Sequence, residues 1–240
     1  MDFALVLMLG LVAGTVGGMV GFGSSIMLMP ALVLVFGPRE AVPIMAIASI
    51  MGNSSRVAAW WREVDWRATA AYSATGIPAA ALGATTLMTL PPGVIEGVMG
   101  IFFISMIPVR RWMARQHWKL NLWHMAIVGA AIGFLTGMVV STGPINAPFF
   151  LMYGLVKGAY LATEALASVA VYLAKAITFR RLGALPVEII LKGLIVGSSL
   201  VAGAFIAKRL VLKLDNEKFK LMMDGLLLVA GLVMLWAALR

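Results

Sequence analysis

The sequence predicts an all-α polytopic membrane protein with two inverted-topology repeats, each a re-entrant or broken helical hairpin plus three transmembrane helices. Three observations predict this fold: the apolar composition, a duplicated order of apolar segments and the distribution of basic residues. The 240-residue chain is 62% hydrophobic and 12% charged, whereas typical soluble domains are about 25% charged. So few charges do not cover a water-facing surface, which excludes soluble, disordered and nucleic-acid-binding proteins.

Eight apolar segments follow one another between charged or turn-forming stretches. A bilayer crossing by a helix needs about 20 apolar residues. Six segments have roughly that length, whereas the first and fifth are longer and are interrupted by glycines and prolines. The segments cover residues 3–36, 43–61, 68–90, 93–109, 122–154, 158–179, 186–207 and 221–239.

The two long segments are predicted to be hairpins. The first is interrupted from Gly17 to Ser25 and contains Pro30, and the second is broken between Gly137 and Pro148. A straight helix over residues 3–36 would be about 50 Å long at 1.5 Å per residue, too long for one crossing of a hydrocarbon core of about 30 Å. The turns must lie inside protein or beside water, because lipid cannot satisfy unpaired backbone groups.

The chain divides into a first transmembrane repeat with a basic linker, residues 1–119, and a second repeat, residues 120–240. Pro30 and Pro148 are 118 residues apart, and Ala48-Ser49 and Ala167-Ser168 are 119 residues apart. Gly, Ala and Val align easily by coincidence, but here the order of the elements agrees as well. An internal repeat with matched interruptions is typical of secondary transporters, whose sites lie at the interruptions.

Basic residues favour the hairpin interpretation of the long segments. If each long segment crosses once, the Lys and Arg residues of the loops and ends divide nine against seven between the two sides. If each returns to its starting side, they divide twelve against four, and Lys and Arg accumulate on the cytoplasmic side. Both termini are then periplasmic, and six tryptophans lie at the cytoplasmic interface: Trp60, Trp61, Trp66, Trp112, Trp118 and Trp123.

Polar residues share one face of the first ordinary span in each half. In the second half the helical spacing of 4, 4 and 3 residues joins Glu164, Ser168, Tyr172 and Lys175; the positions 119 residues earlier are Met45, Ser49, Asn53 and Arg56. Arg56 and Lys175 therefore occupy the same repeat position. Ionisable residues inside a span usually face a cavity, a partner or a substrate. We expect both cations to bind a small anion from opposite halves.

Structural roles that involve no ligand are also possible for these residues. Arg56 and Lys175 are each five residues from the end of a span, so both could extend to the nearer interface. Ser and Asn on such a face also hydrogen-bond between helices. Glu164 could couple transport to protons, or it could neutralise Lys157 near the start of its span.

The interruptions supply further candidate binding groups. Backbone N–H groups at the start of a short helix suit an anion, and glycine lets a ligand approach the backbone. The chain offers such groups at Gly21, Gly23, Ser24 and Ser25, and again at Thr142, Gly143 and Asn146. With no cysteine and two histidines, we expect no metal and no cofactor. Glu188 and Lys192 are expected to form an i,i+4 ion pair.

Two glycine-rich stretches resemble a known family. Residues 21–30, Gly-Phe-Gly-Ser-Ser-Ile-Met-Leu-Met-Pro, resemble the G-x-G-G-G-x-x-x-x-P element of the TauE/SafE sulfite-exporter family, with Ser24-Ser25 where two glycines are usual. Residues 137–144, with the proline at 148, are similar to its second-half counterpart. The resemblance covers the length, the duplication and the basic linker. It implies transport of sulfite, sulfonates or related small anions across the bacterial inner membrane.

The sequence therefore predicts a multi-pass secondary transporter for a small anion, with membrane lipid as its other partner, no nucleic acid, and a homodimer as an open possibility. It predicts no enzyme. Two other classes remain as alternatives: an intramembrane enzyme acting on lipid-linked substrates, and a channel or structural subunit. The enzyme would need a nucleophile–base or carboxylate pair at membrane depth, where Glu164 is the candidate acid.

Overall fold

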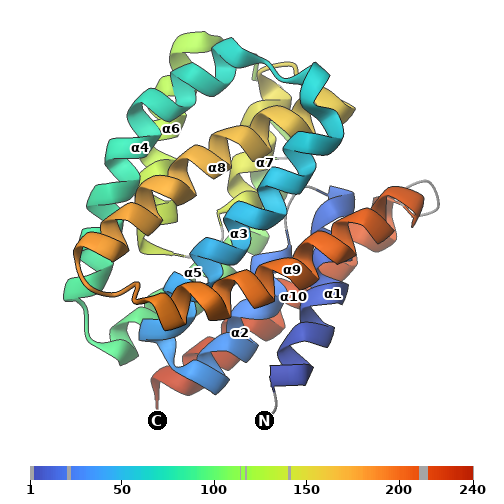
Figure 1. Ribbon diagram of the computed structural model, residues 1–240. Helices are drawn as coiled ribbons and strands as arrows, with labels where there is room; N and C mark the ends of the chain where they lie inside the picture. The colour runs from blue at the N-terminus through green and yellow to red at the C-terminus, as the bar shows by residue number, and fades with distance from the viewer. Residues whose placement is uncertain are drawn as a thin grey trace.

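A computed structural model describes residues 3–20, 23–113, 115–116, 118–139, 142–210 and 216–239, where all regular structure is helical (Figure 1). The first half contains α1 (Phe3–Val20), α2 (Ser24–Phe36), α3 (Pro38–Trp60), the 3-10 helix η1 (Trp61–Glu63), α4 (Trp66–Thr89) and α5 (Pro92–Met113). The second contains α6 (Leu122–Met138), α7 (Gly143–Met152), α8 (Lys157–Arg181), α9 (Val187–Leu210) and α10 (Asn216–Ala238). The all-helical prediction is confirmed, and each long apolar segment forms two helices.

Several helices have the length and composition of membrane spans. In the described part of the chain, three are long and apolar enough to cross a bilayer: residues 92–113, 157–181 and 187–207. Shorter apolar helices cover residues 5–18, 24–36, 122–138 and 227–238. The helices α3 and α8 are the ones that carry the predicted polar face, at Arg56 and at Glu164.

The two hairpins start from opposite edges of the molecule. In Figure 1, α1 begins and α2 ends at the lower edge, whereas α6 begins and α7 ends near the upper edge. The end of α10 lies at the lower edge, with the start of α1. The turns at residues 21–22 and 140–141, including the predicted Gly21, lie outside the described residues.

Each half packs its hairpin against the other half. Helix α1 packs on α9, and its counterpart α6 packs on α4. In the same reciprocal way α3 packs on α9 and α8 on α4, while α3 pairs with α8 and α5 with α10. The halves are therefore interlocked, and the predicted boundary at residue 119 falls in the connection between α5 and α6.

Glycines allow the closest helix contacts. Helix α1 carries Gly10, Gly14 and Gly18, and α6 carries glycines 119 residues later, at 129, 133 and 137. A Cβ on Gly14 would lie 2.4 Å from the Leu200 carbonyl oxygen, and one on Gly133 would lie 2.5 Å from the Gly76 carbonyl oxygen. Small residues every fourth position let membrane helices approach closely. The repeated glycine spacing in the sequence thus indicates where the two halves pack closely. The predicted spans and polar faces do not contain this information.

Two sequence predictions concern surface residues, an ion pair and a set of interfacial tryptophans. The predicted ion pair is confirmed: Lys192 Nζ lies 2.8 Å from Glu188 Oε1, and it also lies 3.1 Å from Glu40 Oε2. All six tryptophans assigned to an interface are exposed, with exposed fractions of 36% to 63%. Their side chains are thus free to contact lipid headgroups.

Candidate functional site

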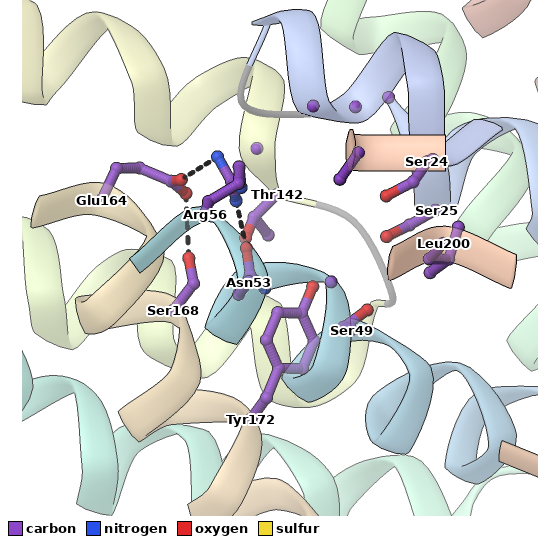
Figure 2. A pocket seen from close by; sticks show the side chains of 17 residues that line it. Ser24, Ser25, Ser49, Asn53, Arg56, Thr142, Glu164, Ser168, Tyr172 and Leu200 are labelled. Atoms are coloured by element: carbon purple, nitrogen blue, oxygen red, sulfur yellow. Dashed lines mark hydrogen bonds and ion pairs between the residues drawn. The ribbon is translucent and has the colours of Figure 1, made fainter. Parts of the chain in front are cut away.

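A small cavity lies where the C-terminal half of α1 and the first residues of α2 meet α3, α7, α8 and α9 (Figure 2). About 50 Å³ is open to the centres of water molecules, room for roughly three or four waters or one small anion. Most of the predicted site residues line it: Gly23, Ser24, Ser25, Asn53, Arg56, Thr142, Gly143, Glu164, Ser168 and Tyr172. The structure therefore brings together residues from both halves.

Two helix faces form the polar wall of the cavity. Helix α3 supplies Ser49, Asn53 and Arg56, which share a face because they are four and three residues apart. Helix α8 supplies Glu164, Ser168 and Tyr172 at spacings of four. These faces meet because α3 and α8 pack against each other. Figure 2 shows the Tyr172 hydroxyl pointing between the α3 side chains.

A buried ion pair joins the two faces. Arg56 Nη1 lies 3.0 Å from Glu164 Oε2, and the two residues are 9% and 3% exposed. Arg56 Nη2 donates to Asn53 Oδ1. Arg56 thus stays in the protein interior in this structure and does not extend to an interface. Glu164 pairs with Arg56, so the alternative in which it neutralises Lys157 is not what the structure shows.

Glu164 is held from two further sides. Ser168 Oγ donates to Glu164 Oε1 at 2.9 Å, and Asn146 Nδ2 donates to the same oxygen at 3.1 Å. Asn146 is 2% exposed and does not line the cavity. Asn146 thus hydrogen-bonds the Glu164 carboxylate from outside the cavity lining.

Two helix N-termini open onto the cavity. Gly23, with φ of 114°, precedes α2 in the left-handed region that favours glycine. Neither α2 nor α7, which follows Thr142, has a side-chain hydrogen bond capping its N-terminus. First-turn N–H groups lack partners within a helix and carry partial positive charge. The cavity therefore combines these two positive helix ends with one guanidinium.

Lys175 lies outside the cavity lining. Its side chain is 0% exposed, and Nζ donates to the carbonyl oxygens of Thr136 and Val139 at 2.7 and 3.1 Å. These carbonyls belong to the C-terminal end of α6, where a cation is favourable. Thr136 Oγ1 is also 2.5 Å from Thr142 Oγ1. Lys175 therefore contacts α6, which in turn contacts a residue of the cavity.

Several lining residues were not among the predicted site residues. Ser49 lines the cavity one turn before Asn53 on the same helix face, so its helical spacing could have identified it as a site residue. The other lining residues are Gly14, Gly17, Gly18 and Gly52 together with Leu200 and Ala204. Gly14 and Gly18 of α1 belong to the repeated spacing described above, but Leu200 and Ala204 enter only through the packing of α9.

The cavity offers binding groups and no evident reactive pair. Within the described residues, no three His, Cys, Asp or Glu side chains gather as a metal site. The charged groups at the cavity are one guanidinium and one carboxylate, which are already paired. Hydroxyls, helix N-termini and a guanidinium can bind and release an oxyanion without changing it.

Apolar helices around a buried polar cavity between two broken helices define the class of multi-pass membrane transport proteins. The family model described as "Sulfite exporter TauE/SafE" matches residues 6–234. The match covers nearly the whole chain, so this protein belongs to the TauE/SafE sulfite exporter family, and the resemblance seen in the glycine-rich stretches is confirmed. No curated protein and no solved structure matches the chain.

Proposed function

We propose that this protein is a secondary transporter that moves a small organic or sulfur-containing anion, such as a sulfonate or sulfite, across the bacterial inner membrane by alternating access. The observation that carries this proposal is the position of Arg56. It is buried and lines the same cavity as the first residues of α2 and α7. A cation held at such depth is expected to serve a ligand, and the ligand suited to these groups is an oxyanion.

Each predicted residue has a part in this proposal. The Arg56 guanidinium binds the anion, and Asn53 fixes its orientation. Side-chain hydroxyls replace the water molecules that the anion loses on binding; they belong to Ser24, Ser25, Thr142, Ser168 and Tyr172. Gly23 and Gly143 let the anion reach backbone N–H groups. Glu164 is the proton-coupling carboxylate and Asn146 positions it, whereas Lys175 holds the end of α6 and does not touch the ligand.

The arrangement of the two hairpins is what an inverted repeat would give, and it supports the proposal of alternating access. The hairpins begin at opposite edges of the molecule (Figure 1), and the main helix contacts correspond when each helix is exchanged for its counterpart, as with α1–α9 and α6–α4. In transporters with inverted repeats, the halves exchange conformations around a central site. A site built from both halves, with Arg56 from one and Glu164 from the other, suits that motion.

Anion flux into liposomes tests the proposed function. We expect purified protein to transport one or more of sulfite, methanesulfonate, nitrate and acetate, and not to transport sodium or potassium. Arg56→Gln should lower the apparent affinity for the anion about ten- to a hundredfold, since a charge-assisted contact is worth roughly 1.5–3 kcal/mol. The control is Arg67→Gln, which removes an exposed cation and should change nothing. Absence of any anion flux would overturn the proposal.

The same experiment separates the alternatives. A channel would conduct without saturating at high anion concentration, and an enzyme would change its substrate. Membership in a transporter family favours transport over both.

Topology can be measured in cells. We expect reporter fusions at Lys119 and after Lys157 to be cytoplasmic and a fusion at the C-terminus to be periplasmic, because basic residues accumulate on the cytoplasmic side. A cytoplasmic C-terminus would contradict the inverted arrangement, since each half would then cross the membrane an even number of times.

A further inference from the structure

The cation at the cavity already forms an ion pair with a carboxylate. Arg56 is the one Lys or Arg side chain among the described residues that line the cavity, and Glu164 lies against it at 3.0 Å. An incoming anion therefore meets a guanidinium whose charge is neutralised. The anion has to displace the carboxylate, or the carboxylate has to lose its charge.

The contact between Arg56 and Glu164 leaves one atom of each side chain able to change its partner. Arg56 Nη2 is held by Asn53, and Glu164 Oε1 is held by Ser168 and Asn146. Arg56 Nη1 and Glu164 Oε2 face each other, but neither makes a directed hydrogen bond with any described residue. Each side chain thus has one anchored atom and one buried atom that can take a new partner.

The charges around Glu164 come from few groups. Of the elements packed on α8, α3 contributes Arg56, α4 the phenol of Tyr72, and α7 the neutral amide of Asn146. Helix α6 has His124 in its first turn, and the η1 region has acidic Glu63 and Asp65 beside the start of α8. On α8 itself the nearby groups are Tyr160 and Tyr172.

Charge balance then decides what accompanies the anion. Phenols titrate near pH 10 in water, so around neutral pH the cavity holds the guanidinium and the carboxylate, and their charges cancel. A bound monovalent anion would leave one net negative charge in the protein interior, which is strongly unfavourable. One proton on Glu164 restores neutrality.

We infer, on the basis of the proposed function, that anion and proton bind together: the anion takes Arg56 Nη1, and Glu164 Oε2 takes a proton from solution. Protonated Oε2 can donate a hydrogen bond to the bound anion, while Oε1 keeps its bonds from Ser168 and Asn146. Anion and proton then cross in the same direction. A monovalent anion is carried without net charge, and an inward proton gradient drives uptake.

Calorimetry on purified protein tests this inference. Methanesulfonate and nitrate keep one negative charge near pH 7, so any proton taken up must go to the protein. Titrations in buffers of different ionisation enthalpy give the number of protons bound with each anion. We expect about one proton for the wild type and none for Glu164→Gln, which should bind the anion with pH-independent affinity. The matched control is Asp224→Asn, because Asp224 is a buried carboxylate paired with Arg111 at 2.6 Å that does not line the cavity; it should keep the uptake.

The outcomes are distinct. Anion binding by the wild type without proton uptake would overturn the inference and leave the proposed function intact, whereas no binding of either anion would overturn both. Uptake that persists in Glu164→Gln would place the proton elsewhere and overturn the assignment to Glu164. If that variant does not fold, the wild type still decides: its anion affinity should fall as pH rises, by up to about tenfold for each pH unit, and a pH-independent affinity contradicts the inference.

Discussion

Arg56 and Lys175 occupy the same position in the two halves, yet their surroundings differ. Arg56 lines the cavity and faces a carboxylate at 3.0 Å. Lys175 lies outside the cavity and binds two backbone carbonyls at the end of α6. The repeat thus places a cation on the same helix face twice, while the groups opposite decide whether it is available to a ligand or supports the fold.

The cause lies in what each half places opposite its cation. Glu164 lies across from Arg56, and the residue at its repeat position in the first half is the apolar Met45. Without a carboxylate, the Lys175 ammonium finds the carbonyl oxygens of Thr136 and Val139. The counterpart of Thr136 is Gly17, which lines the cavity instead. One cation therefore lines the cavity, and the other binds the end of the hairpin helix α6.

The largest expected effect comes from breaking the Arg56–Glu164 pair from one side. Arg56→Gln should destabilise the protein by about 3–5 kcal/mol, because it leaves Glu164 buried without a counter-charge. The double variant Arg56→Gln/Glu164→Gln should recover most of that stability but not the anion affinity. The free energy of unfolding of the wild type, the two single variants and the double variant, measured by denaturation of the purified proteins, gives the interaction energy of the pair. Additive losses would mean that the two side chains do not interact.

Substitution of Lys175 should separate stability from binding. Lys175→Gln shortens the side chain and removes a donor, so stability should fall by about 1–3 kcal/mol for each carbonyl left unpaired. Anion affinity should stay within about twofold of the wild type, in contrast to the loss of at least about tenfold expected for Arg56→Gln. Calorimetric affinity and thermal unfolding, measured together, check this. An affinity loss as large as that of Arg56→Gln would make Lys175 a ligand and remove the contrast between the halves.

The smallest expected effect concerns positions where the halves are alike. Gly14→Ala and Gly133→Ala should each destabilise by about 1–3 kcal/mol, because the added methyl group would overlap a carbonyl oxygen of the facing helix. Gly225→Ala is the control, since its Cβ would meet nothing within 4 Å. Thermal unfolding of the three variants compares the α1–α9 and α4–α6 contacts. Equal stability of all three would show that these interfaces can relax.

The sequence by itself determined the helices, the two broken hairpins and the polar faces of α3 and α8. These features depend on local properties: the length of apolar runs, glycine and proline interruptions, and helical spacing of polar residues such as Asn53 and Arg56. It also determined the family, because the glycine-rich stretch from Gly21 to Pro30 carries the resemblance.

Only the tertiary structure decided which of these groups meet. The pairing of Arg56 with Glu164, the hydrogen bond from Asn146 to that carboxylate and the position of Lys175 against α6 all join residues from different helices. Helical spacing gives the direction in which a side chain leaves its own helix, but not the element that stands opposite. That element is set by the reciprocal packing of the two halves, where the approach of α1 to α9 and of α6 to α4 depends on contacts between residues far apart in the chain.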